Sequence, residues 1–163
     1  YWWIEQASRA HDLLNDYGIQ LGDLLNVRTF LDHNRVWEAP KQSSGKPATS
    51  KGTYAYRGGK LNNSDVEDSL REHLSKWKPY VQKFGLLLIE LHTIPTSVTS
   101  KNLGRTAATA YDATHGFSDQ YILEVDVFTS IASEIGLTPV PAYASKFPNS
   151  ELATVSINLL KGL

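Results

Sequence analysis

A continuous apolar run, GLLLIELHT at residues 85–93, restricts the fold more than any other part of the sequence. Gly85 opens the run and Pro95 follows it closely, so the run has the length of a strand rather than of a helix. Its apolar residues stand at consecutive positions, which is typical of a strand that is covered on both faces in a parallel sheet. Such a strand needs neighbouring strands and covering helices from the rest of the chain.

Three segments place apolar residues at helical spacing and therefore predict amphipathic helices. They are residues 5–17, 64–78 and 122–135. The second has Ser64 as a candidate N-cap and Glu67 three positions later, which is the arrangement of a capping box. Gly18 and Gly136 follow the first and third segments, where glycine readily takes the left-handed conformation that ends a helix.

Strand patterns lie between and after these helices. Residues 25–31 and 152–160 alternate between two sets of side chains, as strands do. Helix, strand, helix, strand, helix and a strand pair follow one another, which predicts an α/β fold with a mostly parallel sheet and an antiparallel hairpin at one edge. Residues 38–60 are rich in Gly, Pro, Ser and Lys and predict a long loop that acts as a lid or is disordered.

The composition excludes several classes of protein. The 163 residues include 16 basic and 17 acidic ones without a long basic block, so we expect no nucleic-acid partner. Cysteine is absent, which excludes disulfides, thiolate metal sites and cysteine nucleophiles and favours the reducing cytoplasm. No stretch approaches the roughly 20 apolar residues that span a bilayer, so we expect no membrane partner.

Polar side chains gather where the predicted strands end. The candidates are Asp32, His33, Asn34, Arg35, Glu90 and His92 at two strand ends, and Asp112, His115, Asp119 and Gln120 before the last helix. In an open parallel sheet the ligand crevice lies beyond the carboxyl ends of the strands. We therefore expect Asp32, His33, His92 and His115 to converge at one crevice.

One chemistry that these residues support is metal binding. Histidine and amide side chains that leave coordination positions open suit a non-haem Fe(II) or Mn(II) ion. His115 and Gln120 share one segment, and His33 follows a neighbouring strand, so these three are the ligand candidates. The absence of thiolates argues against a structural zinc site.

The other chemistry is proton abstraction. His33 or His92 would act as general base, while Arg28, Arg35 or Asn34 would hold a carboxylate or an enolate. We predict His33, His92 and Arg35 as the catalytic residues. The spacing of the residues leaves metal binding and base catalysis both open.

Four long segments carry a family resemblance. They are LLNVRTFLDHNR (24–35), WKPYVQKFGLLLIELHT (77–93), TAATAYDATHGFSDQYILEVDVF (106–128) and FPNSELATVSINLL (147–160). These segments resemble S-adenosylmethionine-dependent C-methyltransferases of the apratoxin polyketide type. The resemblance implies a class I, Rossmann-like methyltransferase core that acts on a malonyl-type acyl thioester carried by an acyl carrier protein. In some members a mononuclear iron or manganese activates the acceptor as an enolate, which implies that role for His115 and Gln120, with His33 as a third ligand.

The chain departs from this family at its start. Such enzymes hold the methyl donor with a glycine-rich turn and an acidic residue in their first half, and we expect this chain to begin after both. Residues 1–163 would then be the C-terminal part of one methyltransferase core, with the missing N-terminal half as a partner and Asp32 and Asn34 as contacts to S-adenosylmethionine. Two alternatives stay open: a non-catalytic docking module, and a metal-dependent hydrolase or lyase that uses the same ligands.

Overall fold

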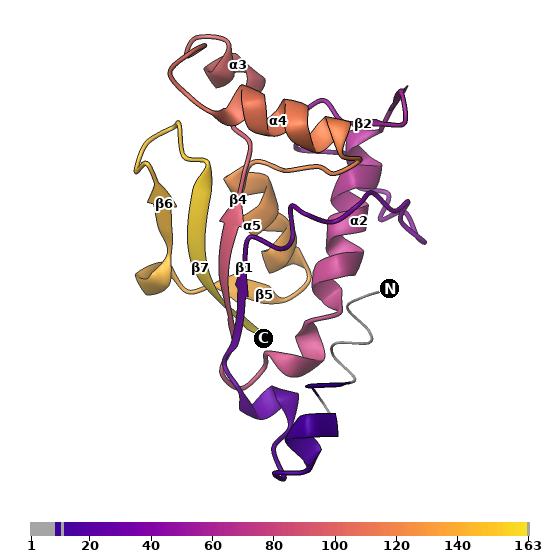
Figure 1. Ribbon diagram of the computed structural model, residues 1–163, viewed down its shortest axis with the longest axis vertical. Coiled ribbons are helices and arrows are strands. Elements are labelled where there is room, and N and C mark those ends of the chain that lie inside the picture. Colours follow the sequence, from indigo (N-terminus) through magenta and orange to yellow (C-terminus); the bar gives the residue numbers. More distant parts are fainter. Residues whose placement is uncertain (1–8, 11, 163) are drawn as a thin grey trace.

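The computed structural model describes residues 9, 10 and 12–162, which form one main β-sheet with helices packed on it (Figure 1). The strands lie in the order β1 (Asn26–Thr29), β4 (Leu86–Leu91), β7 (Val155–Gly162) and β5 (Leu137–Pro139), and β6 (Ser145–Phe147) also pairs with β7. β1 runs parallel to β4, whereas β7 is antiparallel to β4, β5 and β6. β7 therefore runs against the other four strands, and the predicted α/β class with antiparallel pairing at one edge is confirmed.

Helices and a small hairpin complete the described chain. They are η1 (Leu21–Asp23), β2 (Ala55–Tyr56), β3 (Gly59–Lys60), α2 (Asn63–Ser75), η2 (Lys78–Tyr80), α3 (Thr96–Thr99), α4 (Ala108–Phe117), α5 (Val125–Glu134) and η3 (Pro141–Tyr143). α5 confirms the helix predicted within 122–135, and Gly136 follows it with a φ of +84°. No helix in the described part of the chain is long and apolar enough to cross a membrane.

Helices also form within the first two predicted segments, 5–17 and 64–78. Of the predicted helix 5–17, residues 9, 10 and 12–15 are helical, while residues 5–8 and 11 lie outside the described residues. The prediction of Ser64 as an N-cap is wrong, because α2 begins at Asn63 with Asn62 in the N-cap position. The Asn62 side chain donates to Asp65 Oδ2 at 3.2 Å, so the turn is closed by a different polar pair.

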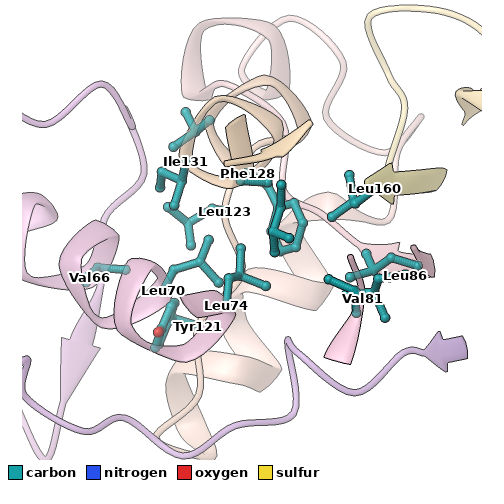
Figure 2. Close-up of a cluster of buried hydrophobic side chains, with 14 of the residues drawn as sticks. Val66, Leu70, Leu74, Val81, Leu86, Tyr121, Leu123, Phe128, Ile131 and Leu160 are labelled. Atoms are coloured by element: carbon teal, nitrogen blue, oxygen red, sulfur yellow. The ribbon is translucent and has the colours of Figure 1, made fainter. Parts of the chain in front are cut away.

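The core lies between one face of the sheet and the helices α2 and α5 (Figure 2). Its largest members include Leu70 and Leu74 of α2, Phe128 and Ile131 of α5, Leu86 of β4 and Leu160 of β7. Each buried side chain of this size contributes roughly 1.5–3 kcal/mol. This packing fixes both helices against the sheet and so fixes the places where β1 and β4 end.

The opposite face of the sheet is only partly covered by the described residues. Leu87, Ile89 and Leu91 are half-buried, so the expectation that this strand is buried on both faces holds for one face only. In β1, Val27 is 55% exposed, and within the described residues the outer edge of β1 has no neighbouring strand. An apolar surface therefore remains on this side of the sheet.

Within the segment 38–60, where a long loop or lid was predicted, residues 38–54 contain no helix or strand and residues 55–60 form the β2–β3 hairpin. Buried carboxylates bind the loop that precedes the hairpin. Glu67 Oε1 accepts the backbone N–H groups of Thr49 at 2.7 Å and Ser50 at 2.8 Å. Glu124 accepts the Ser50 hydroxyl and the N–H of Lys51, each at 2.8 Å. These bonds join the loop to α2 and to the start of α5.

Candidate functional site

The turn that follows β1 is the base of the candidate site. Phe30, directly after the strand, has a φ of +53°, a left-handed conformation that costs a non-glycine residue about 1–3 kcal/mol and persists only where its surroundings hold it. The Asn34 side chain donates to Phe30 O at 2.9 Å and closes the turn. The turn directs His33 toward the end of β4, which runs parallel to β1.

His33 and Glu90 form a hydrogen-bonded pair at this point. His33 Nδ1 bonds Glu90 Oε1, and both side chains are at most 9% exposed. Glu90 also accepts the N–H of Asp32 at 2.8 Å and that of Leu91 at 2.7 Å. A carboxylate can only accept these bonds, so His33 carries its proton on Nδ1 and presents the lone pair of Nε2. Among the described residues Nε2 has no hydrogen-bond partner.

The carboxylate of Asp32, the residue before His33, accepts hydrogen bonds from two side chains. Its Oδ1 lies 2.8 Å from Arg28 Nη2 and 2.5 Å from His73 Nε2. Burial alone would raise the pKa of Asp32, but the hydrogen bond from His73 and the charge of Arg28 outweigh it and hold that pKa well below its usual value. Burial lowers the pKa of His73 to about 4, so an ionised Asp32 faces a neutral His73 at neutral pH.

Arg35, two residues after His33, donates two hydrogen bonds. Its Nε donates to Asp32 O at 3.2 Å, and its Nη2 donates to the hydroxyl of Tyr121 at 2.5 Å. Tyr121 in turn donates to Ser69 Oγ at 3.0 Å. Arg35, Tyr121 and His33 line a small cavity of about 10 Å³ beside Glu90. A guanidinium, an imidazole and a carboxylate therefore lie around one small cavity.

Helix α4 covers this end of the sheet, beyond the end of β4 in Figure 1. His115 lies on its buried side, and the His115 and His33 rings are 5.2 Å apart between centroids. His115 Nδ1 donates to Tyr111 O at 2.5 Å, which leaves Nε2 as its free nitrogen. The Gln120 side chain donates to Asn34 O at 2.8 Å, so Gln120 also lies at this turn. Thr93 donates to Asp112 Oδ2 at 2.9 Å and joins α4 to the end of β4.

Of the other residues predicted from the sequence, His92 and Asp32 are buried and Asn34 is exposed. His92 is fully buried, with Nδ1 3.2 Å from Leu123 O and Nε2 2.7 Å from Ser156 Oγ. Burial lowers the pKa of His92 to about 4, so this residue is a neutral part of the packed interior. The Asp32 side chain is 2% exposed and faces inward, whereas Asn34 is exposed at the rim. Of the four residues expected to converge, His33 and His115 meet directly and Asp32 lies below them.

Two residues of the site were not predicted from the sequence. His73 interrupts the apolar stripe of α2 one position before Leu74, and a polar residue inside such a stripe was the available signal. Tyr121 precedes α5 and gave no signal of its own, because its partner Arg35 is 86 residues away in the sequence.

The fit of a metal ion can be judged from the donor atoms. The described part of the chain holds no group of three or more His, Cys, Asp or Glu side chains arranged to bind a metal. The donors that remain at the turn are Nε2 of His33, Nε2 of His115 and the amide oxygen of Gln120. All three are uncharged, whereas the usual Fe(II) set of two histidines includes a carboxylate.

The fit of S-adenosylmethionine can be judged in the same way. Pockets for ligands of drug-like size measure about 300–1,000 Å³, far more than the cavity beside His33. Asp32 is buried and binds Arg28 and His73, and Asn34, although exposed at the rim, uses its side-chain N–H to bind Phe30 O. Where β1 and β4 end, the described residues alone therefore do not enclose a pocket for this cofactor.

The sheet order, with an antiparallel strand beside parallel ones and a polar crevice at the strand ends, is that of an α/β methyltransferase-like domain. The family model described as "AprA MT2-like domain" matches residues 4–158, and the chain belongs to this family of methyltransferase domains. No curated protein matches the chain significantly.

Proposed function

We propose that this domain catalyses the S-adenosylmethionine-dependent methylation of a carbon atom next to the thioester carbonyl of a malonyl-type acyl group on an acyl carrier protein. The observation that carries the proposal is the His33–Glu90 pair at the ends of two parallel strands. Carbon methylation requires a base, because the α-carbon must lose a proton before it attacks a methyl group. The pair has the composition and the hydrogen-bond geometry of such a base.

His33 is the base in this proposal. The proton passes from the α-carbon of the acyl group to His33 Nε2, and the electron pair of the broken C–H bond forms the new bond to the methyl carbon. S-adenosylmethionine, when bound, would supply that methyl group from a positively charged sulfur, which would keep the electron pair of the broken S–C bond and become a neutral thioether. Glu90 stabilises the imidazolium through Nδ1 and keeps the ring oriented, as carboxylates do for catalytic histidines. General base catalysis of this kind contributes about 10²- to 10⁴-fold in rate.

Arg35 is the candidate for charge stabilisation. Two of its five N–H groups bind Asp32 O and the Tyr121 hydroxyl, and the guanidinium lines the cavity that His33 also lines. Its remaining donors are suited to the free carboxylate of a malonyl group or to the oxygen of the enolate. The carrier protein with its acyl thioester is the partner that this chemistry requires.

The methyl donor needs a second structural partner. We propose that the N-terminal half of the methyltransferase core packs along β1 and completes the cofactor pocket. The half-exposed Leu25 and Val27 support this arrangement, as does the outer edge of β1, which lacks a partner within the described residues. Activity should therefore be measured in the protein that contains both halves.

The test is a methyl-transfer assay on an acyl-loaded carrier protein, with the product followed by mass spectrometry. His33→Ala is expected to lower kcat by about 10²-fold or more, while the matched variant His92→Gln, at a buried histidine that does not itself line the cavity, keeps a rate near that of the wild type. Equal rates for wild type and His33→Ala would contradict the proposal.

A second candidate is metal-assisted methylation, which the adjacent rings of His33 and His115 favour. An Fe(II) or Mn(II) ion would be held by Nε2 of both histidines and by the Gln120 amide oxygen, and it would supply a Lewis acid for the acceptor carbonyl. The two proposals exclude each other at His33, because a lone pair that binds a metal cannot take a proton. Elemental analysis separates them: stoichiometric metal that is lost in His115→Ala favours the metal, and its absence favours the base.

A further inference from the structure

His73 is a buried histidine whose side chain binds Asp32, the residue next to His33. It lies in α2, is 8% exposed, and its Nε2 is 2.5 Å from Asp32 Oδ1. The backbone N–H of Asp32 donates to Glu90 Oε2 at 2.8 Å, and the other oxygen of Glu90 binds His33. A continuous path of hydrogen bonds and one short backbone segment therefore joins α2 to the His33 ring.

The turn at the centre of this path requires external support. Phe30 has a φ of +53°, and residues with side chains adopt this conformation only where neighbouring contacts impose it. Arg28 also binds the Asp32 carboxylate, at 2.8 Å, but it belongs to β1 and moves with the strand that carries the turn. His73 belongs to a different element, and Leu70 and Leu74 on either side of it are fixed in the core. His73 thus joins the Asp32 carboxylate to α2, whereas Arg28 joins it to the strand that precedes the turn.

The protonation state of His73 suits this task. Burial lowers its pKa to about 4, so the ring is neutral near pH 7 and can donate one proton, from Nε2, to the ionised Asp32. A donor of fixed direction orients its acceptor, whereas a charged ring would add a second positive charge beside Arg28. Besides burial, the charged groups that act on the pKa of His73 are Asp32, Arg35 and Arg28.

We propose that His73 is a positioning residue for the His33–Glu90 pair. It fixes Asp32 so that the Asp32 N–H stays on Glu90 Oε2, which leaves Glu90 Oε1 to hold His33 with its proton on Nδ1. This inference rests on the proposed role of His33 as a base, and it adds a residue of α2 that does not touch the substrate.

The experiment compares His73→Leu, which removes the donor, with His73→Gln, which offers an amide N–H of similar reach. His92→Leu serves as the control, since His92 is also buried but its side-chain hydrogen bonds go to Leu123 O and Ser156 Oγ rather than to Asp32 or Glu90. Two readouts are used on the protein that contains both halves. One is the tautomer of His33 from ¹⁵N–¹H spectra, and the other is kcat and KM for the acyl-loaded carrier protein.

In His73→Leu we expect kcat to fall about 10- to 100-fold with KM nearly unchanged, because a small misplacement of a catalytic group costs about this much. The His33 spectrum should change from a single Nδ1–H form to a mixture, and His73→Gln should restore both readouts. His92→Leu should leave the His33 tautomer unchanged even though it lowers stability.

A folded His73→Leu protein with wild-type kcat and an unchanged His33 tautomer would overturn the inference. If His73→Leu does not fold, the comparison is made between His73→Gln and the shorter His73→Asn, and equal kcat values for these two would overturn it. The proposed function is tested separately by His33→Ala. If that variant is inactive while the His73 variants behave as wild type, only the positioning role fails; if His33→Ala is active, the base itself fails.

Discussion

Replacement of Glu67 tests how the loop 38–60 is held on the fold. Glu67 is 1% exposed, and its Oε1 accepts the N–H groups of Thr49 and Ser50. Glu67→Ala removes the acceptor for both groups. A buried donor without an acceptor costs about 1–3 kcal/mol. Ser50 is nearly as buried as Glu67, whereas Thr49 is exposed and water can replace its acceptor. We therefore expect a loss of about 1–3 kcal/mol, a substantial part of the roughly 5–15 kcal/mol that stabilises a domain.

Two variants make this prediction specific. Glu67→Gln keeps a carbonyl oxygen for the two N–H groups and should cost only about 1 kcal/mol. Glu72→Ala removes a comparable acceptor, since Glu72 Oε1 binds the N–H groups of Lys41 and Gln42 at 2.6 and 3.0 Å in an exposed setting where water can replace it. It should cost less than about 1 kcal/mol.

The assay is urea unfolding with linear extrapolation, together with hydrogen exchange of the Ser50 amide. The exchange of this amide should accelerate in Glu67→Ala and remain slow in Glu72→Ala. Equal free energies of unfolding for Glu67→Ala and Glu67→Gln, or an equal loss in Glu72→Ala, would refute the reasoning.

Two further predictions concern the fold and its pH dependence. Gly85→Ala should destabilise by about 2–5 kcal/mol, because φ is +93° and the new Cβ would lie 2.6 Å from Leu160 O, whereas Gly104→Ala, with positive φ but open space, should cost about 1–2 kcal/mol; equal losses in thermal unfolding would contradict this. The lowered pKa values of His73 and His92, about 4 against an ordinary 6.5, mean that the unfolded chain binds more protons in this window. The free energy of unfolding should therefore fall as the pH is lowered from 6.5 to 4, by at most about 1.4 kcal/mol per pH unit for each histidine. Urea unfolding across this range checks the slope, and a flat profile would count against neutral buried histidines.

The sequence predicted those elements whose pattern depends on local packing alone. The apolar run gave β4, and the helical stripe before Gly136 gave α5. Helix α4 was missed, since among its ten residues only Ala108 and His115 are buried and no apolar stripe exists. In β1 the alternation was visible, but its covered face was not: Arg28 is buried by Asp32 and Trp77 while Val27 is exposed.

The position of the candidate site could be predicted from the sequence, but the pairing of its side chains could not. The rule that ligands bind at the ends of parallel strands located His33, and the structure adds that Glu90 is its partner. Pairing depends on the register of β1 against β4, which no local pattern encodes. His92, two residues beyond Glu90, instead forms a hydrogen bond with Ser156 of β7. The metal ligands His115, Gln120 and His33 stay a prediction, although all three side chains lie at one turn.

The central claim is that His33 removes a proton from the α-carbon of a carrier-bound acyl group. The most direct measurement is the uptake of deuterium from D₂O into that carbon, followed by mass spectrometry in the absence of S-adenosylmethionine, so that only the proton-transfer step is observed. Wild-type protein should exchange the α-hydrogen faster than the carrier alone, and His33→Ala and Glu90→Gln should lose this enhancement. Undiminished exchange in His33→Ala would contradict the account.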